Sequence, residues 1–167
     1  GADKIICMGD FASMDSLSSW DRGKKSFQGR RYRKDIDHAH QALELFNKGM
    51  GNHKAEMHMT LGNHEDRIDR MVEDNPELEG AISIDDLDYP SYGWNEYTYR
   101  YPVVIDGIHY SHNFPSGLMG SAISGENIAR TLLNKNKVSS TVGHCHLLDY
   151  AIGAYPTGKK IMGLSAG

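Results

Sequence analysis

Side chains of the kind that bind divalent metal ions occur in four separate parts of the chain. They belong to Gly9-Asp10, Gly62-Asn63-His64-Glu65, His112 and Gly143-His144-Cys145-His146. Imidazole nitrogens and carboxylate or amide oxygens suit ions such as Mn²⁺, Fe²⁺ or Zn²⁺. Two such ions about 3.5–4 Å apart can hold a hydroxide and clamp the oxygens of a phosphate. The ligand types therefore indicate a metal-dependent phosphoester hydrolase.

Each candidate ligand follows a segment that the sequence predicts to be a strand. Apolar runs and an Asp106-Gly107 turn predict strands at residues 4–8, 56–61, 103–105, 108–111 and 138–142. In an open α/β sheet, the carboxyl ends of parallel strands line one crevice. We therefore expect the candidate ligands to meet at the strand ends.

The remaining segments predict helices and connecting loops. Helices are expected at residues 33–48, 66–72 and 128–133, with Gly49 ending the first. Residues 11–29 predict a long loop, and a last hairpin is expected around residues 156–160, followed by a strand at 161–167. Tyr97, Tyr99 and Tyr101 alternate, which predicts a strand with one aromatic face. The element order favours an α/β fold with helices outside the sheets.

The ordered set of motifs Gly-Asp, Gly-Asn-His-Glu, His and Gly-His-x-His resembles the calcineurin-like metallophosphoesterase superfamily. The resemblance covers residues 5 to 146. It implies a four-layer α/β/β/α sandwich of mixed sheets, with the metal site at the carboxyl ends of the strands. The family opens with a strand ending in Asp-x-His, a motif this chain lacks, and residues 161–167 resemble a strand that has just begun. We therefore expect residues 1–167 to be a single domain truncated at both ends.

The resemblance also implies a ligand set for a binuclear centre. One metal takes Asp10, Asn63, His112 and His144, and the other takes Asp10, His146 and the two residues of the absent motif. The full-length protein would then hold two divalent ions (Mn²⁺, Fe²⁺ or Zn²⁺), and this chain would contain one complete site. A hydroxide between the ions would attack phosphorus in line.

Two neighbours of Asn63 have other implied roles. His64 would contact the phosphate or protonate the leaving group as the catalytic acid. Glu65 would orient a neighbouring side chain by hydrogen bonding.

Other histidines and both cysteines have simpler interpretations. His144 and His146 are two residues apart, so we expect both to face the same side of an extended segment, with Cys145 facing away. His109 lies three residues from His112, so it faces the other side of a strand and is expected to pack there. Gly51-Asn52-His53 repeats the triplet of the second motif, but it follows a helix and is interpreted as a helix cap and surface loop. Cys7 is expected to be a reduced core residue.

The composition excludes some classes of protein. The 167 residues carry a net charge of −4, which argues against a general nucleic-acid binder. No segment has the length and apolarity of a membrane span, and we expect a cytoplasmic protein. The basic residues between 22 and 34 either steer phosphate-bearing substrates or form a solvated face. The tyrosine-rich stretch with Trp94 either stacks on a base or aryl ester, or packs against the core.

Two functions remain open from sequence alone. The first is a hydrolase of phosphomonoesters or phosphodiesters, including nucleotides or nucleic acid, in a phage-like setting. Residues 9–21 depart from the Gly-Asp-x-x-Asp-Arg-Gly form of the protein phosphatases, which disfavours a phosphoprotein substrate. The alternative is a non-catalytic module on the same fold that binds metal or protein.

Overall fold

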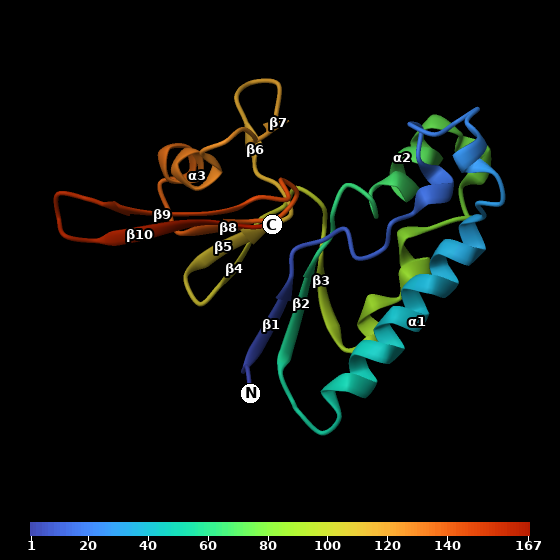
Figure 1. The fold of residues 1–167 in the computed structure, drawn as a ribbon, viewed down its shortest axis with the longest axis horizontal. Coiled ribbons are helices and arrows are strands. Elements are labelled where there is room, and N and C mark those ends of the chain that lie inside the picture. Colours follow the sequence, from blue (N-terminus) through green and yellow to red (C-terminus); the bar gives the residue numbers. More distant parts are fainter.

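Two sheets, each with a helix packed against it, make up a mixed α/β fold in the computed structural model, which describes residues 1–167 (Figure 1). The first sheet is parallel, in the order β1-β2-β3, and consists of β1 (Lys4–Cys7), β2 (Glu56–Thr60) and β3 (Trp94–Tyr97). The second has the order β4-β5-β8-β10-β9. Its strands are β4 (Val103–Ile105), β5 (Ile108–Ser111), β8 (Ser140–Val142), β9 (Leu148–Ala154) and β10 (Lys160–Ala166). The predicted α/β class is confirmed.

Two parallel pairs determine where the site can form. In the first sheet, Ile5 of β1 is in register with Met57 of β2, and the two strands point the same way. In the second, β5 and β8 are parallel, with Ser111 opposite Val142. The antiparallel hairpins β4–β5 and β9–β10 flank this pair. Four carboxyl ends therefore face the space where the two sheets meet.

The larger core lies between the first sheet and α1 (Tyr32–Met50). Ile36 and Leu43 recur at helical spacing and pack, fully buried, with Met59 of β2. The helix continues through Gly49 and ends at Gly51, whose φ is 55°, so the predicted stop at Gly49 is wrong. Glycine is tolerated in a helix at a modest cost, whereas a positive φ favours it at the cap. The interpretation of residues 51–53 as a cap and exposed loop is confirmed.

The smaller core lies between the second sheet and α3 (Ile128–Asn136), which covers one face of β9 and β10 (Figure 1). Ile128 and Leu132 are fully buried, together with Val142 of β8. A β-carbon on Gly163 of β10 would overlap the backbone carbonyl of Ala129. The absence of that carbon lets α3 approach the sheet closely.

The predicted strand over the three alternating tyrosines is wrong. β3 ends at Tyr97, and the chain then turns, with the Tyr101 amide donating to the Thr98 carbonyl. The three side chains diverge as a result. The Tyr97 hydroxyl pairs with His58, the Tyr99 hydroxyl accepts from Asn113, and Tyr101 is 71% exposed.

Short elements occupy the connections. α2 (Arg67–Asp74) follows β2, and a two-stranded ribbon joins β6 (Pro115–Ser116) to β7 (Ser121–Ala122). Single 3₁₀ turns lie at Asp15–Leu17, Lys25–Phe27, Pro76–Leu78, Ile84–Leu87 and Tyr89–Tyr92. The first two interrupt the predicted loop 11–29. The last hairpin is confirmed as β9 and β10. None of the helices combines the length and the apolar character needed to cross a bilayer.

Candidate metal centre

Three potential ligands meet where the two sheets adjoin. Asp10 follows β1, His112 follows β5 and His144 follows β8. One ligand atom from each lies within 4.8 Å of the others. Asn63, which follows β2, belongs to the same group, because its Oδ1 is 3.0 Å from His112 Nε2. The structure thus brings together four of the five residues predicted as metal ligands.

His112 lies at the centre of the group and is only 2% exposed. Its Nδ1 lies 2.6 Å from the carbonyl of Met8, an acceptor, so this nitrogen carries a proton. Its Nε2 lies 3.0 Å from Asn63 Oδ1, 3.1 Å from His144 Nδ1 and 3.4 Å from Asp10 Oδ2. The other ring nitrogen therefore faces three polar atoms at once.

These atoms form a set that suits a cation. In the tautomer with its proton on Nδ1, the His112 ring presents a lone pair at Nε2. In that tautomer Asn63 Oδ1 and the Asp10 carboxylate, which are acceptors too, face the lone pair without a proton between them. A divalent ion accepts lone pairs from imidazole, amide and carboxylate at once. The Met8 carbonyl resembles the outer hydrogen-bond partner that commonly orients a metal-binding histidine. The residues present therefore fit a metal.

His64 lies beside this group. Its backbone amide donates to Asp10 Oδ1 at 2.9 Å, and its Nε2 is 3.8 Å from Asp10 Oδ2. The side chain is half-buried, and burial lowers the pKa of the imidazole, although the charge of Asp10 acts in the opposite direction. The ring is thus within reach of an atom bound at the group.

Glu65 is fully buried and organises the two loops that carry Asp10 and Asn63. Its carboxylate accepts from the amides of Asp10, Ala12 and Gly62 at 2.9–3.0 Å. The Tyr89 hydroxyl donates to the same carboxylate at 3.2 Å. One carboxylate thereby fixes the loop after β1 against the loop after β2.

Glycines allow these loops to touch. Gly9 has φ 88°, and a β-carbon there would lie 2.6 Å from the Thr60 carbonyl and 2.7 Å from His112 Nδ1. A β-carbon on Gly62 would overlap the backbone and carboxylate of Asp10. Asp10 itself has φ 55°, a conformation that non-glycine residues seldom adopt and that is often found at functional sites.

The expectation that residues 144–146 are extended is wrong. His144 and His146 have φ values of 64° and 52°, so the chain bends at both. His146 is exposed and lies outside the group formed with Asp10. Alternation along a strand cannot hold where the backbone is left-handed. The ligand role of His146 stays a prediction. The Cys145 thiol points away, toward the Ile123 carbonyl at 3.3 Å.

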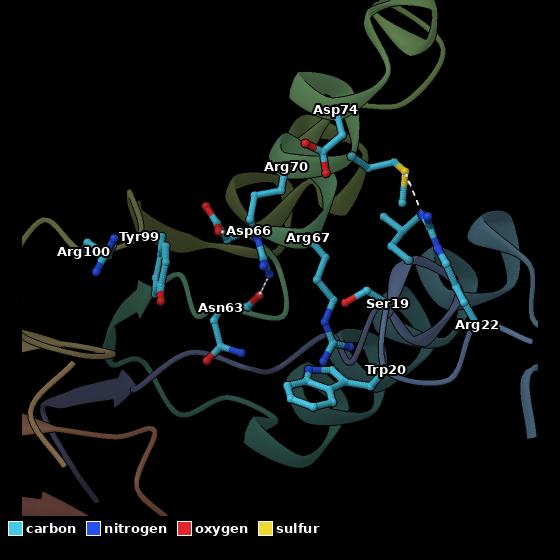
Figure 2. A pocket seen from close by; sticks show the side chains of 12 residues that line it. Ser19, Trp20, Arg22, Asn63, Asp66, Arg67, Arg70, Asp74, Tyr99 and Arg100 are labelled. Carbon is cyan, nitrogen blue, oxygen red and sulfur yellow. Dashed lines mark hydrogen bonds and ion pairs between the residues drawn. The ribbon is translucent and has the colours of Figure 1, made fainter. Parts of the chain in front are cut away.

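A cavity of about 370 Å³ adjoins the group and was not foreseen from the sequence. Figure 2 shows it between α2, which carries Arg67 and Arg70, and the loop that carries Trp20 and Arg22. Asn63 lines it too, so the cavity reaches the candidate metal centre. The sequence feature that could have indicated this cavity is the spacing of Arg67 and Arg70. Three residues apart, they lie on one face of a helix directly after the second motif.

The basic segment contributes little of this cavity. Only Arg22 among its residues lines the wall, whereas Lys24 and Arg30 pair with Asp21 and Arg33 pairs with Asp37. Three of the seven basic residues are thus in ion pairs, and all but Arg30 are exposed, so most of the segment is a solvated surface.

Comparison with protein-family models, curated proteins and solved structures finds no match for this chain. The function must be argued from the site itself.

Proposed function

We propose that the protein is a metal-dependent hydrolase of phosphoesters. The proposal rests on one observation: the side chains of Asn63, His144 and Asp10 all approach Nε2 of His112, the ring nitrogen that presents a lone pair. These residues would hold a divalent cation at the strand ends, and such an ion would supply Lewis-acid chemistry toward phosphate oxygens and water. The group contains no thiolate ligand, unlike most structural zinc sites, which favours a catalytic role.

The chain's own residues have separate tasks in this proposal. Asp10, Asn63, His112 and His144 would hold one ion, and His146 would contribute to a second. His64 reaches the bound phosphoester and gives its proton to the departing oxygen. Glu65 keeps the loops in place without contacting the substrate. The four-layer α/β/β/α sandwich expected from the family resemblance belongs to the same proposal, supported by α1 on one sheet and α3 on the other.

The state of the two cysteines bears on the cellular setting. Both cysteines are free thiols, which is the usual state in a reducing compartment. We propose the cytoplasm as the place where the protein acts, on phosphomonoesters or phosphodiesters.

The test is hydrolysis of p-nitrophenyl phosphate and bis-p-nitrophenyl phosphate by the purified protein. We expect turnover with Mn²⁺ and none in EDTA. His64→Ala should lower kcat at least tenfold while Mn²⁺ content stays unchanged, because general acid catalysis typically contributes about 10²–10⁴-fold. His109→Ala, a histidine outside the group, should leave both unchanged. Mn²⁺ bound at the group with no turnover on either ester would instead support the non-catalytic binding module.

A further inference from the structure

The cavity beside Asn63 combines positive charge with exposed aromatic surface. Its charged lining residues are four arginines and two aspartates, Arg22, Arg67, Arg70, Arg100, Asp66 and Asp74, which leaves a formal charge of +2. Guanidinium groups are suited to phosphate, because they present several donors in a planar fork. The chain as a whole carries −4, so this basic lining runs against the overall charge.

The arginines differ in how many of their N–H donors already have a partner within the protein. Arg70 pairs with Asp66 at 2.9 Å and donates to the Asn63 carbonyl at 3.0 Å. Arg67 donates to the Ser13 carbonyl at 2.6 Å. Arg22 reaches only the sulfur of Met71, at 3.6 Å, and makes no ion pair with a carboxylate. The donors of Arg22 therefore remain available to an anion.

Trp20 supplies the aromatic surface. The side chain is 81% exposed although it is among the largest apolar side chains, and it lines the same cavity as Arg22 (Figure 2). Trp94, by contrast, is 4% exposed in the larger core. Burying an indole is strongly favourable, so an exposed one bordering a basic cavity is a surface on which a planar ring can stack. Tyr99 lines the wall as well and lies beside His112, with ring centroids 6.1 Å apart.

We propose that this cavity binds a nucleoside phosphate, with the base on Trp20 and a phosphate on Arg22 and its neighbours. The inference rests on the proposed function in one respect, since it names the substrate class of that site. The volume of about 370 Å³ is at the lower end of ordinary ligand sites and suits one nucleotide rather than a protein segment. Because Asn63 borders both places, a nucleotide in the cavity directs its phosphoester at the metal group.

Binding without metal tests the cavity separately from hydrolysis. The quantity measured is the affinity of the protein in EDTA for AMP and for ribose 5-phosphate, by isothermal titration calorimetry. AMP should bind more tightly than the sugar phosphate, which lacks the base, and should quench the tryptophan emission of the wild-type protein. Trp20→Ala should weaken AMP binding about 5- to 160-fold, in line with about 1–3 kcal/mol for stacking one base. Trp20→Phe should retain most of the affinity.

Matched arginine variants test the phosphate contact. Arg22→Gln should weaken AMP and ribose 5-phosphate alike, by about three- to tenfold, because it removes a charge-assisted contact. Arg33→Gln, the same change of charge on the exposed face of α1, should alter neither. A single-stranded tetranucleotide separates the two sources of a nucleotide: tighter binding than AMP indicates a strand of nucleic acid, and weaker binding indicates the free nucleotide.

Different results would refute the nucleotide site and the hydrolase function. Equal binding of AMP and ribose 5-phosphate, or AMP binding unaffected by Trp20→Ala, would overturn the nucleotide site while leaving metal-dependent hydrolysis intact. AMP binding through Trp20 in a protein that hydrolyses no phosphoester would refute the hydrolase and keep the nucleotide site.

Discussion

The imidazole of His112 donates its Nδ1–H to the carbonyl of Met8 at 2.6 Å, which fastens the second sheet to the end of the first. The same ring presents Nε2 to Asn63, His144 and Asp10. One buried side chain thus joins the two sheets and centres the candidate metal group.

His112→Ala should therefore affect both stability and metal. We expect a loss of about 2–4 kcal/mol in the free energy of unfolding, because the change opens a cavity and leaves the Met8 carbonyl without its donor. Mn²⁺ affinity should fall at least tenfold. Denaturant unfolding and metal titration measure the two effects. His109→Ala on the same strand is the control, and an equal loss of metal there would show that the effect is not local.

Glu65→Gln should destabilise the protein without removing a metal contact. The amide replaces one carboxylate oxygen with an NH₂ group that faces backbone donors, so we expect a loss of about 2–4 kcal/mol. Tyr89→Phe removes only one of the four donors to this carboxylate and should cost about 1 kcal/mol. Chemical denaturation of both variants gives the comparison. Similar small losses in the two would mean that the buried carboxylate does not fix the loops.

Two glycine-to-alanine changes should alter the free energy of unfolding in opposite directions. At Gly62 the new methyl group would overlap the backbone and carboxylate of Asp10, so both stability and metal affinity should fall. At Gly49, inside α1, nothing lies within 4 Å of an added β-carbon, and the variant should be more stable by about 0.5–1 kcal/mol. Thermal unfolding decides the sign for each. A harmless Gly62→Ala would contradict the close approach of the two loops.

The Cys7 thiol should react slowly in the folded protein. Burial raises its pKa from the ordinary 9.0 to about 11, so at pH 8 almost none is thiolate. Between about pH 9 and pH 11 the thiol ionises in the unfolded protein but not in the folded one. The free energy of unfolding should therefore decline as the pH rises across that range. Labelling with a disulfide reagent at pH 8 in a Cys145→Ser background, before and after denaturation, checks the reactivity. Rapid labelling of the folded protein would contradict this burial.

Strand and helix positions were largely predictable from local patterns. The apolar run before Gly9 and the Asp106-Gly107 turn each predicted an element that the structure contains, because burial and turn chemistry depend on neighbouring residues. The tyrosine strand was wrong for a related reason. Alternation continues to Tyr101, but the backbone turns after Tyr97, and Arg100 has φ 68°.

The candidate site was predictable in its members and less so in its geometry. The meeting of Asp10 with His112 and His144 followed from placing each at a strand end. The bend at His144 and His146 did not, because a left-handed φ at histidine has no sequence signal. The cavity was missed because it brings Trp20 and Arg22 of one loop against α2, a contact set by tertiary packing.

Metal content tests the central claim most directly. The protein, loaded with Mn²⁺ and desalted, is analysed by inductively coupled plasma mass spectrometry beside His112→Ala and His64→Ala. We predict that wild type and His64→Ala retain at least one ion per chain and that His112→Ala retains none, since four ligands converge only where His112 is present. Wild-type protein that keeps no ion, or a His112→Ala variant that keeps as much as wild type, would contradict the account.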